Sequence, residues 1–193
     1  MTTPLFDAPS RGRRREIDLT PWLDDAKAQA RFRAKVYDPG LPDACMPWLR
    51  TISSSGHGEF HLGPGGSSPV RAHRFAWLLH TRGAPPPVVM HHCDEHSCVN
   101  PHHLLAGTVA LNTLDYYRRG RHGGSSPLAD PRGRQQRAEA IKRAINEAET
   151  PQAKLIAYRR AIEIPRPWRE QAGQLAIPAP VDPEPLPGQL ALF

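Results

Sequence analysis

The chain lacks a long hydrophobic run and is poor in cysteine. No segment of its 193 residues joins a charged flank to an apolar stretch long enough for secretion or for crossing a membrane. Its three cysteines are an odd number, which argues against the disulfide framework of a small secreted domain. These absences disfavour the membrane and secreted classes, and we expect a soluble cytoplasmic protein without a membrane partner.

Proline and glycine, by contrast, are abundant. With 22 prolines and 15 glycines, the whole chain is not expected to pack into one core, and we predict one compact domain of under about a hundred residues with extended flanks. Apolar burial alone stabilises a domain of that size poorly, so a structural metal is a sensible addition. Zinc ligation contributes roughly 10–16 kcal/mol in peptide hosts, more than the net stability of most domains.

The charge balance is basic. A net charge of +6 and a pI near 9.6 favour a polyanionic partner such as nucleic acid. A basic surface is also common in proteins that bind nothing acidic, and the excess of arginine over lysine, beside abundant Ala, Pro and Gly, is typical of a GC-rich genome. Charge alone therefore leaves both interpretations open.

Turn residues and apolar periodicity divide the chain into segments. The pattern predicts helices over residues 20–37, 70–79 and 109–119 and strands over 45–52, 58–62, 88–91 and 104–105. A helical hairpin with a Thr150-Pro151 cap is predicted further on. The expected organisation is a disordered basic arm at 1–16, a compact domain at 17–121, a Gly/Ser linker at 122–133, the hairpin at 134–164 and a Pro-rich tail at 165–193.

Metal-ligating side chains are concentrated between Val88 and Asn112. Cys93 and Cys98 are followed by His103, a set of soft and borderline ligands of the kind that a tetrahedral zinc site uses. Cys45, the one other cysteine, would complete a closed Cys3His site and leave no sulfur unassigned. The alternative is a set of ordinary buried thiols, but a loop this polar offers them little apolar company. We therefore predict one structural zinc.

The order strand, loop, strand, helix, with His91 ending the first strand and Asn112 in the helix, resembles the ββα-metal (His-Me) finger of HNH endonucleases. The pattern H-x-C-x4-C-x-N-P-x-H-L, which begins at His91, looks most like the His-Cys box and related zinc-stapled, phage-type HNH proteins. Upstream motifs at 31–36, 58–63 and 72–77 are similar to phage and bacterial members, so the resemblance covers residues 31–121. It implies an α+β fold with a zinc-stapled ββα-metal core, preceded by a β-hairpin and helices.

The resemblance also implies roles for single residues. His91 is the expected general base, which must be neutral to accept a proton from water. Asn112 is the expected ligand of a catalytic Mg²⁺ or similar cation, and Cys45, Cys93, Cys98 and His103 are the expected zinc ligands. Arg74 would either clamp the scissile phosphate or pair with an acid. Many HNH proteins have an acidic residue directly before the histidine, whereas this chain has Met90, so the cation depends on Asn112 and phosphate.

Three further histidines receive no catalytic role. The spacing to the first thiolate selects His91 over His92 as the base, and His96 and His102 are left unassigned. His73 is expected to pack or to hydrogen-bond behind the site.

The chain ends in a short peptide with apolar anchors. Gln189, Leu190, Leu192 and Phe193 form a Q-L-x-L-F pattern that resembles the peptide by which bacterial DNA-processing proteins dock on the sliding clamp. Such motifs also recur by chance, and the tail could instead fold back on the domain.

The sequence therefore predicts a metal-dependent HNH endonuclease that hydrolyses DNA phosphodiester bonds in a bacterial or phage-infected cell. One alternative is a catalytically silent, zinc-stapled DNA-binding protein. Another is an accessory protein associated with the clamp or with DNA packaging.

Overall fold

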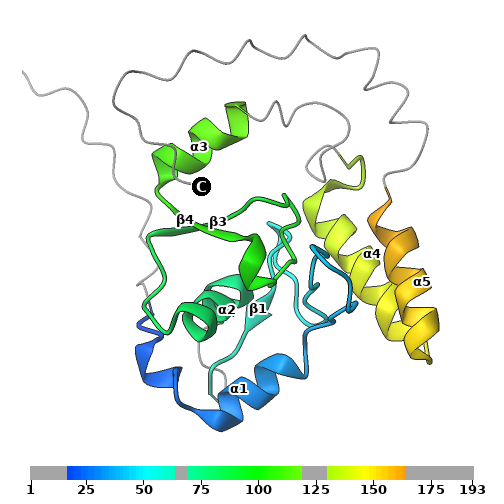
Figure 1. Ribbon diagram of the computed structural model, residues 1–193. Coiled ribbons are helices and arrows are strands. Elements are labelled where there is room, and N and C mark those ends of the chain that lie inside the picture. The colour runs from blue at the N-terminus through cyan, green and yellow to red at the C-terminus, as the bar shows by residue number, and fades with distance from the viewer. Residues whose placement is uncertain (1–16, 64–68, 119–129, 164–193) are drawn as a thin grey trace, which may run out of the picture.

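A computed structural model describes residues 17–63, 69–118 and 130–163 (Figure 1). These residues include five α-helices and two small sheets of two strands each, which confirms the predicted α+β class. The basic arm 1–16, the tail 165–193 with its clamp-like peptide and most of the predicted linker lie outside the described residues. No helix within the described ranges has the length and apolar character that a membrane span requires.

The first predicted helix is shorter than the sequence pattern suggests. A 3-10 turn, η1 (Thr20–Trp22), precedes α1 (Ala26–Arg33), and Asp25 caps α1 by accepting a hydrogen bond of 2.9 Å from the Ala28 amide. The predicted end of the helix is extended instead, because Val36 pairs with Trp48 in an isolated β-bridge. Asp25 therefore starts the helix, and the Thr20-Pro21 signal produces only one 3-10 turn.

The two strands predicted over 45–52 and 58–62 are mostly irregular. Isolated bridges join Pro47 to Cys98 and Ile52 to Gly58, and regular pairing is limited to β1 (Glu59–Phe60) with β2 (Val70–Arg71). Pro47 has no amide hydrogen to donate to a ladder. The 53–56 turn forms as predicted, with the Gly56 amide donating to the Ser53 carbonyl at 2.9 Å.

The main core surrounds α2 (Ala72–Thr81). Its residues Phe75 and Leu78 are fully buried, and Phe75 packs against Phe32 and Phe60 with ring centroids 5.1 and 4.9 Å apart. Burying each side chain of this size contributes roughly 1.5–3 kcal/mol. Helix α2 begins and ends two residues later than predicted, and it stops where Arg82 adopts the left-handed conformation with φ 54°.

The predicted strand, loop, strand, helix order is present. Strand β3 (Val88–His91) pairs antiparallel with β4 (Leu104–Gly107), and His91 lies opposite Leu104. The connecting loop ends in η2 (Pro101–His103). Helix α3 (Val109–Arg118) follows β4, and the Thr108 hydroxyl accepts from the Leu111 amide at 3.2 Å. Figure 1 shows α3 standing apart from the other helices, and none of its residues is buried.

The helical hairpin, α4 (Gly133–Glu147) and α5 (Pro151–Ile162), packs against the rest of the molecule. The two helices lie side by side, and Thr150 caps α5 by accepting from Ala153 at 3.1 Å (Figure 1). Ala138 belongs to the main core. Arg137 is buried and donates to Glu95 at 2.7 Å and to Asp130 at 2.8 Å. Moving α4 away would leave these buried charges without their partners, which is strongly unfavourable. The network therefore fixes the position of α4.

Candidate metal centre and adjoining cavity

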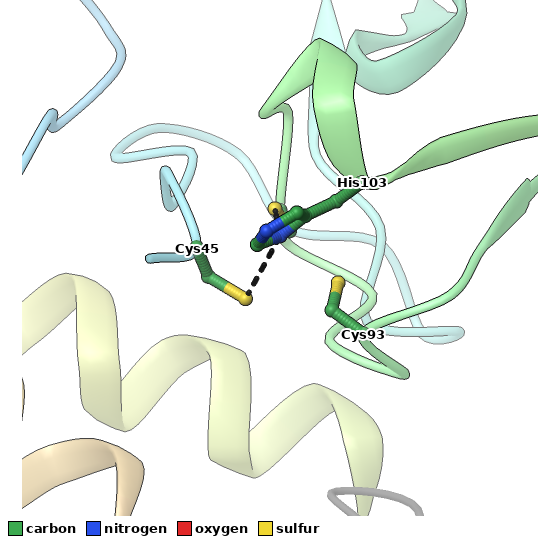
Figure 2. Close-up of side chains that lie close together, drawn as sticks. Cys45, Cys93 and His103 are labelled. Carbon is green, nitrogen blue, oxygen red and sulfur yellow. Dashed lines mark hydrogen bonds between the residues drawn. The ribbon is translucent and has the colours of Figure 1, made fainter. Parts of the chain in front are cut away.

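Cys45, Cys93, Cys98 and His103 form a group that can hold a metal ion, here named the Cys3His group. Their four ligand atoms all lie within 4.8 Å of one another, which confirms the prediction that these residues come together. Figure 2 shows Cys45 and Cys93 directing their sulfurs toward the His103 ring from separate loops. Cys45 comes from the loop after α1, Cys93 and Cys98 from the loop after β3, and His103 from η2.

The distances suit zinc. The Nδ1 atom of His103 lies 3.6 Å from the sulfur of Cys45 and 3.6 Å from that of Cys98. Ligands at about 2.3 Å (sulfur) and about 2.0–2.1 Å (nitrogen) from a tetrahedral zinc would lie about 3.6 Å apart. Asn100 ties the contributing loops together, because its side chain donates to the Ala44 carbonyl at 2.8 Å.

The protonation of the three thiols also favours a cation. Hydrogen bonds from the thiols of Cys45 and Cys98 lower the pKa of Cys93, and the same bond to Cys93 raises the pKa of Cys45. Burial raises the pKa of Cys98. A divalent cation is a partner that would let all three sulfurs lose their protons together.

The helical hairpin covers one side of the Cys3His group. A small cavity of about 180 Å³ is lined by Cys45 and Cys93 on one side and by Ile141 of α4 and Tyr158 of α5 on the other. The pale yellow-green α4 passes beneath the sulfurs in Figure 2. Burial raises the pKa of the Tyr158 hydroxyl, which therefore stays neutral beside the thiols.

A larger cavity of about 410 Å³ adjoins this centre and is named here the His91 cavity. His91 at the end of β3, Arg74 of α2 and Asn112 of α3 all line it. Asn112 is exposed, so its amide oxygen is accessible to an incoming ligand. The Arg74 guanidinium donates to the Pro86 carbonyl at 2.8 Å, which orients the side chain along the segment that leads into β3.

His91 is held in one tautomer. It is buried, and its Nε2 lies 3.0 Å from the carbonyl oxygen of Cys98. A carbonyl only accepts, so Nε2 carries the hydrogen and the neutral ring has its lone pair on Nδ1. Burial lowers the pKa of His91. Because Cys98 belongs to the Cys3His group, one peptide unit connects the metal centre to the cavity.

Further histidines surround His91. The rings of His57 and His73 lie 5.7 and 4.8 Å from that of His91, and His96 stacks parallel to it at 6.2 Å. Burial lowers the pKa of His57 to about 2 and that of His96 to about 4, and it holds the pKa of His73 well below its usual range. These rings are therefore neutral at physiological pH.

Several residues of the cavity were not singled out from the sequence. Besides His57 and the unassigned His96, the wall includes Ser55, Arg71 and Arg134. His57 follows an ordinary polar turn, and Arg134 lies beyond a predicted linker, so no local pattern marks either residue. Only long-range packing brings them to His91.

The predicted residues thus fall into two adjoining groups, the Cys3His group and the trio of His91, Arg74 and Asn112. Comparisons with protein-family models, curated proteins and solved structures found no match. Function is therefore inferred from the chemistry and arrangement of these side chains.

Proposed function

We propose that the protein is a metal-dependent DNA endonuclease of the HNH type. The observation that carries the proposal is that His91, Arg74 and Asn112, which belong to three different elements, line one cavity beside a Cys3His group. The order of β3, β4 and α3 is the order that a ββα-metal finger requires. A net charge of +6 is consistent with a polyanionic substrate.

Within this proposal His91 is the general base. Its Nδ1 accepts a proton from the attacking water, while the Cys98 carbonyl holds Nε2–H and stabilises the imidazolium that forms. A general base of this kind contributes typically 10²–10⁴-fold to the rate. The Cys3His group, filled by zinc, fixes that carbonyl and with it the orientation of the base.

Asn112 and Arg74 bind the cation and the scissile phosphate, respectively. The Asn112 amide oxygen suits Mg²⁺, which commonly keeps several waters and needs few protein ligands. When bound, that cation would neutralise charge on the scissile phosphate and on the leaving 3′ oxygen. Arg74 would contact a phosphate oxygen through its guanidinium, which the Pro86 carbonyl holds in place.

Met90 favours a second candidate. Where many HNH proteins carry an acidic residue before the histidine, this chain has a buried methionine, which leaves Asn112 with less help in binding a cation. A catalytically silent, zinc-stapled DNA-binding protein, free or associated with a sliding clamp, is the alternative.

A nicking assay separates the two. Supercoiled plasmid is incubated with Mg²⁺ and with wild-type protein, His91→Ala or His92→Ala, the last an exposed neighbour that serves as the matched control. We expect the wild type and His92→Ala to nick, and His91→Ala to lose at least ~100-fold in rate, by the general-base contribution. Zinc content and circular dichroism verify that each variant is folded. Equal binding without nicking by any of the proteins would support the silent alternative.

A further inference from the structure

Arg134 is the basic residue of the helical hairpin that lines the His91 cavity. It lies in the first turn of α4 and is exposed, and its side chain makes no hydrogen bond or ion pair with the described residues. Its charge helps to lower the pKa of both His57 and His96, which places it near these two rings. The charged residues that line the cavity are Arg71, Arg74, Arg134 and the single carboxylate Asp94, so its lining carries an excess of positive charge that an anion can use.

The position of Arg134 is fixed by packing on both sides. A Cβ atom at Gly56 would come within 2.8 Å of the Arg134 carbonyl oxygen, so the 53–56 turn touches the α4 backbone directly. One turn along α4, Arg137 is buried against Glu95 and Asp130. The first turn of α4 is therefore anchored to the metal-binding loop, and the Arg134 side chain extends from a rigid base.

A second arginine lies on the same wall. Arg71 of β2 lines the cavity, and its charge also acts on His57. Glu59 pairs with Arg71 at 3.4 Å, a long and partly exposed contact that leaves most of the guanidinium donors unused. The volume of about 410 Å³ falls within the range of ordinary ligand sites, so it accommodates more than the single phosphate assigned to Arg74 and Asn112.

We propose that Arg134, with Arg71, forms a second phosphate subsite that binds the DNA backbone next to the scissile phosphate. The inference rests on the proposed function. In it, the helical hairpin forms one wall of the His91 cavity and contributes to substrate binding. Arg134 is a positioning residue here, because it holds substrate and takes no proton.

Equilibrium binding of a labelled DNA duplex, without added Mg²⁺ and without chelator, tests this subsite. We expect Arg134→Gln to raise Kd by about 5–10-fold and to lower the slope of log Kd against log salt concentration by about one, the signature of one lost phosphate contact. Arg143→Gln is the matched control, an exposed arginine on the same helix outside the cavity lining, and it should change neither quantity. Arg134→Lys should keep the salt slope.

The outcomes separate the two proposals. Equal Kd and equal salt slope for Arg134→Gln and Arg143→Gln would overturn the subsite, as would a wild-type protein that does not bind duplex DNA. A wild-type protein that binds DNA but never nicks it with Mg²⁺ defeats the nuclease proposal, and the arginine variants still decide the subsite.

Discussion

His91 and Cys98 connect the metal centre to the cavity at the level of single atoms. The backbone carbonyl of Cys98, a member of the Cys3His group, accepts a hydrogen bond of 3.0 Å from the His91 ring and thereby sets the tautomer of His91. The proposed zinc site and the proposed base are thus separate in role but coupled in position. Mutating a zinc ligand should therefore disturb the cavity as well as the fold.

The half-buried His57 predicts a pH dependence of stability. The pKa of His57 is about 2 in the folded protein and about 6.5 in an unfolded chain, so between these values the unfolded state binds the extra proton. The contribution of His57 to the free energy of unfolding is therefore largest above about pH 6.5. Below that pH, the contribution falls by about 1.4 kcal/mol for each pH unit.

Substitution of His57 isolates this contribution. In denaturant titrations between about pH 6 and pH 4.5, His57→Gln should reduce the slope of unfolding free energy against pH by about 1.4 kcal/mol per unit. His61→Gln, at an exposed side chain, is the matched control variant. An unchanged slope in His57→Gln would show that His57 is not buried in its neutral form.

At the scale of elements, the contact between the 53–56 turn and α4 depends on glycine. Gly56 has a φ of +83° and abuts the Arg134 backbone, whereas Gly40 has a φ of +66° and no atom within 4 Å of the place that a Cβ would occupy. An alanine at either position would have to adopt the left-handed conformation, which lowers the free energy of unfolding by roughly 1–2 kcal/mol. Only at Gly56 does the added methyl also collide with another element.

Paired alanine variants measure that collision. Gly56→Ala should lose about 2 kcal/mol more unfolding free energy than Gly40→Ala in urea titrations, an overpacking cost of the usual size. Equal losses in the two variants would mean that α4 does not rest on the turn, and would remove the anchor from which Arg134 extends.

Local signals predicted the elements around the site. Thr108 starts α3, and Asn100 caps η2 by accepting from the His102 amide at 3.0 Å, so the Cys and His spacing falls on a loop whose ends are fixed. These are short-range effects, which one sequence can reveal. The helical hairpin and its Thr150 cap were recognisable for the same reason.

Long-range packing accounts for what the sequence could not predict. The buried pair of Arg137 with Glu95 joins residues 42 positions apart, and no pattern in either segment identifies the partner. His57 lies beside His91 because the 53–56 turn packs against the first turn of α4. The helix predicted from Thr20 failed because Asp25 is the residue that caps, and the β1–β2 pairing was missed because both strands are two residues long.

At the scale of the whole molecule, the helical hairpin, the Cys3His group and the β3–β4–α3 segment form one connected body. Arg137 links the hairpin to the loop between Cys93 and Cys98, and the Cys98 carbonyl links that loop to His91. The exposed helix α3 contributes Asn112 to the lining of the cavity. In the proposed function, a substrate phosphate would therefore meet Asn112 on this exposed helix.

Our central proposal is that two metal ions have two purposes, zinc for structure and a second cation for chemistry. It is tested most directly by titrating Mg²⁺ onto protein dialysed to a measured zinc content and following the rate of plasmid nicking. We predict one zinc per chain, no nicking before Mg²⁺ is added, and a rate that rises and saturates with Mg²⁺ while the zinc content stays constant. Full nicking by the zinc-loaded protein without Mg²⁺, or none at any Mg²⁺ concentration, would contradict the claim.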